Sequence, residues 1–133
     1  MKRTPSPLPL PEHIAEYAFD FRWSNERLWQ LEVPTETLPV DELVWHFDIP
    51  WLHTPGGRFD LKPTDIMTHP DLYPDEYART MQADTSYPID IMSNNGRWLI
   101  LDGLHRLMKS VDAGEETVTV RKISRELVPK IKK

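Results

Sequence analysis

The arrangement of apolar and polar positions is most informative between residues 97 and 114. Four apolar residues in succession, Trp98 to Leu101, are typical of a buried strand. Asp102-Gly103 interrupts this run, and beyond it apolar residues recur at helical spacing, at Leu104, Leu107, Met108 and Val111. Because Gly114 stands where a helix of this length ends, the pattern predicts a strand, a tight turn and an amphipathic helix.

Two further strands are predicted from alternating positions. Pro88 to Met92 alternates, and Ser93-Asn94-Asn95-Gly96 favours a hairpin leading into the strand 97–101, since Asn and Gly tolerate positive φ. Thr117 to Ile123 alternates as well. We expect this last strand to pair with the strand 97–101.

Two helices are predicted upstream. Leu38 to Leu43 opens one, with Pro39 in its first turn and Pro50 beyond its end. Tyr73 to Ala83 forms the other, with Pro74 at its start and acidic residues in the first turn. With the strands, these helices predict an α+β fold with a small mixed sheet and packed helices.

We divide the chain into an N-terminal arm (1–36), one domain (37–125) and a basic tail (126–133) whose end we expect to be frayed. The arm begins with prolines at 5, 7, 9 and 11, a spacing that favours an extended conformation. Ala18 to Trp23 alternates like a short strand, and Ser24 is placed to cap a helical turn that runs through Leu31. Its aromatic residues either clamp the arm onto the domain or form a homodimer contact: Phe19, Phe21, Trp23 and Trp29.

Charge is divided unevenly along the sequence. Residues 1–96 hold seven Lys/Arg and sixteen Asp/Glu, a balance of −9, whereas residues 97–133 hold nine and five, a balance of +4. The positive part begins with the strand 97–101, which suits a phosphate-bearing ligand there, and the acidic remainder makes duplex DNA an unfavourable partner. No apolar run approaches the roughly 20 residues of a membrane helix. Together with the absence of cysteine, this fits a cytoplasmic protein.

The turn at Asp102-Gly103 has the features of an anion site. The first N–H groups of a helix have no partner within it and carry the positive end of its dipole, so they bind phosphate. Gly103 and Leu104 would offer backbone, Arg106 a forked charged donor and His105 a donor of adjustable charge; Lys109 lies one turn beyond. Alternatively, Asp102 is a helix N-cap and the two basic side chains are simply solvated.

The string Asp102-Gly103-Leu104-His105-Arg106, between an apolar strand and an amphipathic helix, resembles the signature of the ParB/sulfiredoxin superfamily. Sulfiredoxin has Gly-Cys-His-Arg there, archaeal free-serine kinases Asp-Gly-His-His-Arg, and ParB Gly-Glu-Arg-Arg. The likeness spans roughly Leu38 to Ile123, although its specific part is the short motif. It implies that the segment holds the phosphates of a nucleotide such as ATP, ADP or CTP, with or without Mg²⁺.

Departures from the family narrow this expectation. Leu104 stands where sulfiredoxin has its nucleophilic cysteine, and the sequence contains no cysteine, so sulfiredoxin chemistry is excluded. The region after the last strand is too short for the DNA-reading helices of ParB. The catalytic glutamate of the free-serine kinases has no clear match, and Asp65, His69 and Asp71 are the candidates for that role.

Asp102 is the residue on which the choice of function depends. Beside a phosphate it can hold Mg²⁺ or accept a proton from an attacking hydroxyl, with His105 and Arg106 stabilising the transferred group. The sequence thus predicts a nucleotide- or phosphate-binding domain that is either a small-molecule phosphotransferase, acting on a hydroxyl-bearing substrate, or a non-catalytic regulatory or partition-related module. A nuclease is a weaker third interpretation. A metal site at His46, Asp48 and His53 is a minor alternative, as is a phosphate contact in the flexible turn Thr54 to Arg58.

Overall fold

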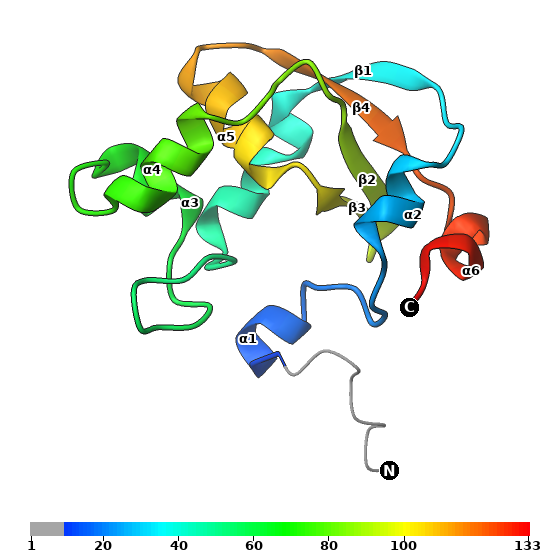
Figure 1. Cartoon of the computed structure of the whole chain (residues 1–133), viewed down its shortest axis with the longest axis horizontal. Helices are drawn as coiled ribbons and strands as arrows, with labels where there is room; N and C mark the ends of the chain where they lie inside the picture. Colours follow the sequence, from blue (N-terminus) through cyan, green and yellow to red (C-terminus); the bar gives the residue numbers. More distant parts are fainter. Residues whose placement is uncertain (1–9) are drawn as a thin grey trace.

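The computed structural model describes residues 10–133, and a four-stranded mixed sheet lies at their centre (Figure 1). The strands are β1 (Thr35–Pro39), β2 (Ile89–Asn94), β3 (Arg97–Asp102) and β4 (Thr117–Lys122), in the order β1-β4-β2-β3. β2 runs parallel to β4, and the β1–β4 and β2–β3 pairs are antiparallel. The predicted α+β class with a mixed sheet is confirmed.

The hairpin β2–β3 forms as expected. Its two loop residues, Asn95 and Gly96, have φ values of 51° and 79°, the left-handed pair that suits a two-residue connection between twisted strands. The pairing predicted for the last strand is wrong, because β4 lies between β1 and β2 and leaves β3 at the edge of the sheet. A side chain already occupies that edge: Nε2 of His46 accepts the backbone N–H of Ile100 at 3.1 Å.

Helices cover both faces of the sheet. In chain order, the α-helices of the described part are α1 (Glu12–Ala15), α2 (Asn25–Trp29), α3 (Pro63–Thr68), α4 (Pro74–Met81), α5 (Leu104–Asp112) and α6 (Val128–Ile131). Three 3₁₀ turns accompany them: η1 (Val40–Glu42), η2 (Val44–Asp48) and η3 (Arg125–Leu127). Both α4 and α5 lie where the sequence predicts helices. Gly114, with φ of 81°, ends α5, and Glu115 N–H donates to the Ser110 carbonyl at 3.0 Å across this turn.

Each face of the sheet has its own hydrophobic core. The first core packs Ile89, Ile91 and Val120 of the sheet against Leu107 and Met108 of α5, with α3 and η2 beside them. The second lies under the arm, α2 and α6, and its residues are Phe19, Phe21, Leu28, Met92, Leu99, Leu101, Ile123 and Ile131. The arm is therefore packed on the sheet through Phe19 and Phe21, whereas Trp29 is 56% exposed.

A buried ion pair joins the arm to the sheet. Asp90 of β2 and Arg121 of β4 are both buried, and Arg121 Nε donates to Asp90 Oδ1 at 2.6 Å. The same guanidinium donates to the carbonyls of Leu28 and Leu31, at 2.9 and 2.7 Å, where α2 ends. Burial raises the pKa of the Asp90 carboxyl, and the hydrogen bonds and charge of Arg121 oppose that rise. Arg121 thus satisfies a helix terminus and a carboxylate at once.

Three local expectations differ from the structure. Leu38 and Pro39 belong to strand β1, because Leu38 pairs with Val118 of β4 and is buried, and only short 3₁₀ turns follow. The segment from Ala18 to Trp23 is not a strand; Trp23 alone forms a bridge, with Lys132. Since Ile131 is fully buried in the second core, the end of the tail is packed and not frayed.

The cap predicted at Ser24 is present. Its hydroxyl accepts the backbone N–H of Arg27 at 3.3 Å, at the start of α2, although that helix ends at Trp29 and does not run through Leu31.

Candidate functional site

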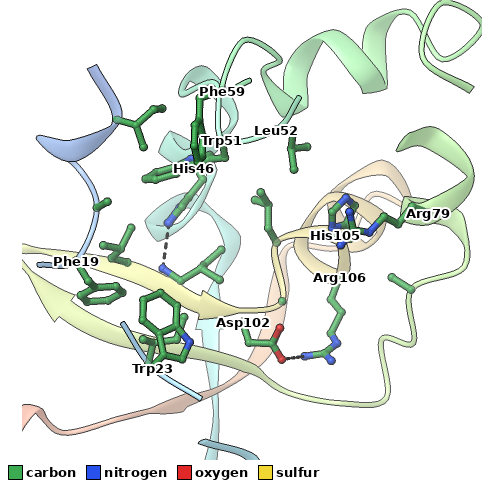
Figure 2. Close-up of a pocket in the computed structure, with 18 of the residues that line it drawn as sticks. Phe19, Trp23, His46, Trp51, Leu52, Phe59, Arg79, Asp102, His105 and Arg106 are labelled. Carbon is green, nitrogen blue, oxygen red and sulfur yellow. Dashed lines mark hydrogen bonds and ion pairs between the residues drawn. The ribbon is translucent and has the colours of Figure 1, made fainter. Parts of the chain in front are cut away.

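A pocket of about 650 Å³ opens along the end of β3 and the start of α5 (Figure 2). Its floor is Leu99 to Gly103, the arm forms one side and the segment 51–59 forms another. Aromatic rings gather at one end: Phe19, Trp23, Trp51 and Phe59. Charged side chains lie toward the other end: Arg79, Asp102, His105 and Arg106. Gln82 and Asp84 also line the pocket.

Gly103 makes the turn from β3 into α5, and it is the helix N-cap, with φ of 119°. A Cβ at this position would lie 3.2 Å from the Cα of Ile89, so both the conformation and the close approach require glycine. The N–H groups of residues 104–106 form the first turn and have no acceptor within the helix. The alternative that Asp102 caps the helix is wrong, because Gly103 occupies that position and Asp102 makes no cap hydrogen bond.

Asp102 contacts the arm and the helix instead. Its Oδ2 accepts the indole N–H of Trp29 at 2.9 Å and lies 3.5 Å from Nη1 of Arg106. Its Oδ1 has no hydrogen-bond partner among residues 10–133. One oxygen of this half-buried carboxylate is therefore fixed in place, and the other is available to a ligand, a cation or a proton.

Arg106 keeps part of its donor capacity for a ligand. Nη1 donates to the carbonyl of Pro88 at 3.1 Å, and the ring of Tyr87 lies 5.7 Å from the guanidinium carbon. Within the described chain, Nε and Nη2 have no acceptor. Arg106 is thus positioned by its neighbours and can still offer a forked pair of N–H groups.

His105 pairs with a glutamate that the sequence analysis missed. Nε2 of His105 lies 2.9 Å from Oε2 of Glu76, and Nη1 of Arg79 lies 3.7 Å from the other oxygen. The only signal for Glu76 was its place among the acidic residues that open the predicted helix 73–83, because nothing local links it to a histidine 29 positions later. A carboxylate that holds one imidazole nitrogen fixes the orientation of the ring and leaves Nδ1 for a ligand.

The remaining candidates lie elsewhere. Lys109 donates to the Ala83 carbonyl at 2.9 Å and does not line the pocket. Asp65, His69 and Asp71 are also outside its lining, and residues 10–133 contain no cluster of three or more metal-ligating side chains. His46 and His53 are separately engaged, His46 with Leu43 and Ile100 and His53 with the Phe59 N–H at 2.6 Å.

The segment 54–58, predicted as a flexible turn, belongs to a loop that side-chain hydrogen bonds hold in one conformation. Asp60 accepts the Thr54 N–H at 2.8 Å and the Thr54 hydroxyl at 2.7 Å, and these hydrogen bonds lower the pKa of the Asp60 carboxyl. A side chain at Gly57 would collide with that carboxylate. The backbone bridge between Leu52 and Leu61 closes the loop, which directs Phe59 into the aromatic end of the pocket.

Comparison of the chain with protein-family models, curated proteins and solved structures gave no match. In the part of the chain that the structure describes, no helix is both long and apolar enough to cross a membrane. The case for function therefore depends on the pocket itself. It combines a helix start, an arginine with unused donors, a carboxylate with a free oxygen, a paired histidine and an apolar wall.

Proposed function

We propose that this chain is a ParB/sulfiredoxin-like domain that binds the phosphate of a nucleotide at the start of α5. The observation that carries the proposal is the convergence of the first turn of α5, Arg106 and His105 at the polar end of one large pocket. Backbone N–H groups and the helix dipole would hold the phosphate, and Arg106 would add a charge-assisted contact. A pocket of this size holds a nucleotide-sized molecule rather than an isolated ion.

We expect Arg106→Ala to weaken the binding of ATP, ADP or CTP about tenfold or more, because a hydrogen bond to a charged group contributes roughly 1.5–3 kcal/mol. The measurement is isothermal titration calorimetry, preceded by a thermal-shift screen with and without Mg²⁺. Lys122→Ala is the matched control: it removes one positive charge from a surface pair with Glu36 and leaves the pocket lining unchanged. Equal dissociation constants for Arg106→Ala and wild type would contradict the proposal.

Phosphoryl transfer to a small hydroxyl compound is the second candidate function, and the free Oδ1 of Asp102 favours it. That oxygen can accept the proton of an attacking hydroxyl, or it can contribute to the one or two carboxylates with which Mg²⁺ is held beside phosphate oxygens. The alternative is a non-catalytic regulatory or partition-related module, in which Asp102 only positions Arg106 and Trp29.

The variant Asp102→Asn distinguishes the phosphotransferase from the non-catalytic module. If Asp102 is the base, nucleotide affinity should persist while turnover falls about 10²-fold or more. In a binding module without Mg²⁺, loss of the negative charge should tighten phosphate binding slightly. The measurement pairs nucleotide affinity with phosphate release or transfer over a panel of hydroxyl compounds. Absence of turnover in wild type, together with tighter binding by the variant, would exclude the transferase.

A further inference from the structure

Phe59 has a backbone conformation that a bulky side chain rarely adopts. Its φ is 49°, and apart from glycines only Asn95, in the hairpin loop, shares a positive φ among the described residues. Asparagine tolerates this region, whereas phenylalanine is strained in it. Strain of this kind persists only where the surroundings fix it, and it concentrates at sites that grip ligands.

Hydrogen bonds hold both backbone polar groups of Phe59, its N–H and its carbonyl. Its N–H donates to Nδ1 of His53 at 2.6 Å, and its carbonyl lies 3.1 Å from Nε2 of His13, which belongs to α1 of the arm. The Thr54–Asp60 hydrogen bonds and the Leu52–Leu61 bridge hold the loop from below. The ring is half-buried and lines the pocket beside Trp51 (Figure 2), and it packs edge-to-face on the ring of His53 with centroids 4.6 Å apart.

We propose that the aromatic end of the pocket binds a flat aromatic ring of the ligand, and that Phe59 is the specificity-determining residue that contacts it. The proposal rests on the proposed function in one respect: the ring and the phosphate belong to the same molecule. Several aromatic rings in the lining favour a flat, polarisable group over an alkyl chain, because stacked and edge-to-face contacts are specific to π-systems. A bare phosphate or a phosphorylated sugar would leave this apolar wall in contact with water.

The test compares ATP, adenosine and tripolyphosphate as probes of the whole ligand, the ring and the phosphates. We expect ATP to bind wild-type protein about five- to 150-fold more tightly than tripolyphosphate, the range that base–aromatic stacking contributes. Adenosine should compete with ATP. Phe59→Gly should remove the advantage of ATP over tripolyphosphate, and Phe59→Tyr should retain it.

Phe59→Gly also separates a ligand contact from a structural role. Glycine adopts φ of 49° without strain, which offsets part of the stability lost with the ring and with the added freedom of the unfolded chain, so the variant should stay folded while it loses the ring-dependent affinity. Leu72→Ala is the control, because Leu72 is 66% exposed and outside the pocket lining. A lower melting temperature with unchanged ATP affinity would show that Phe59 only packs against its own loop, and would overturn the inference.

The failures of the two proposals are distinguishable. Equal affinity for ATP and tripolyphosphate, lost in Arg106→Ala but not in Phe59→Gly, would overturn the ring site and leave phosphate binding in place. Adenosine binding that depends on Phe59, combined with ATP affinity that is unchanged in Arg106→Ala, would overturn phosphate binding at Arg106 and leave the ring site in place. Failure of both ATP and adenosine to bind would overturn the ring site as well.

Discussion

Replacing Arg121 by methionine is expected to lower the free energy of unfolding by about 3–5 kcal/mol, because it leaves the buried carboxylate of Asp90 without a partner. The substitution also removes the donors that satisfy the Leu28 and Leu31 carbonyls at the end of α2. Urea denaturation followed by tryptophan fluorescence and by far-ultraviolet circular dichroism would measure the change. For a domain of this size, so large a loss places the variant close to the limit of stable folding.

The matched control is the double variant Asp90→Leu/Arg121→Met. With both charges removed, no buried ion is left unpaired, and part of the lost stability should return. The recovery should be incomplete, since the two α2 carbonyls still lack donors. A single variant within 1 kcal/mol of wild type would show that water reaches Asp90 and that the pair contributes little.

The free energy of unfolding should also fall as pH drops from about 6.5 to about 4, because folding buries His46 in its neutral form. Burial lowers the pKa of His46 from its ordinary value of 6.5 to about 4, and the nearby charge of Arg97 acts in the same direction. Between these two values the unfolded chain binds a proton that the folded chain excludes, so the free energy of unfolding decreases as pH falls. The full effect, reached below pH 4, is about 3 kcal/mol.

His46→Gln isolates this contribution, because glutamine does not titrate. At pH 7 the wild type should be the more stable protein, since His46 is hydrogen-bonded to the Leu43 carbonyl at 2.7 Å and accepts the Ile100 N–H. The difference between the two proteins in urea unfolding should narrow as pH approaches 4. A difference that stays constant from pH 7 to pH 4 would mean that His46 titrates normally in the folded state.

Local sequence signals were sufficient for part of this fold. Asn95-Gly96 and Gly114 predict a hairpin and a helix end because their positive φ values are set by the residues themselves. The position of β4 could not be predicted in this way, since it depends on pairing with strands distant in sequence, β1 and β2. Leu38 was ambiguous for a similar reason: apolar spacing fits a helix start, and only its pairing with Val118 makes it a strand residue.

The candidate site also has a part that could be predicted from local sequence and a part that could not. The segment from Asp102 to Arg106 is contiguous, so its turn and helix start could be predicted from sequence, and the structure places these residues in one pocket. Glu76 and Trp29 reach the segment through space, from α4 and α2, and no spacing in the sequence identifies them. Phe59 could not be identified from the sequence, because residue type alone argues against a left-handed phenylalanine.

The contacts between α6 and the arm bear on the order in which the pocket is built. Ser24 N–H donates to the Ile131 carbonyl at 2.8 Å, Lys133 N–H donates to the Arg22 carbonyl at 3.0 Å, and Ile131 packs beside Phe19 and Phe21. During synthesis the arm leaves the ribosome before α6. The wall of the pocket that carries Phe19 and Trp23 therefore gains these contacts only after α6 has been synthesised, so a nascent chain still lacking α6 would leave the aromatic residues of the arm less covered.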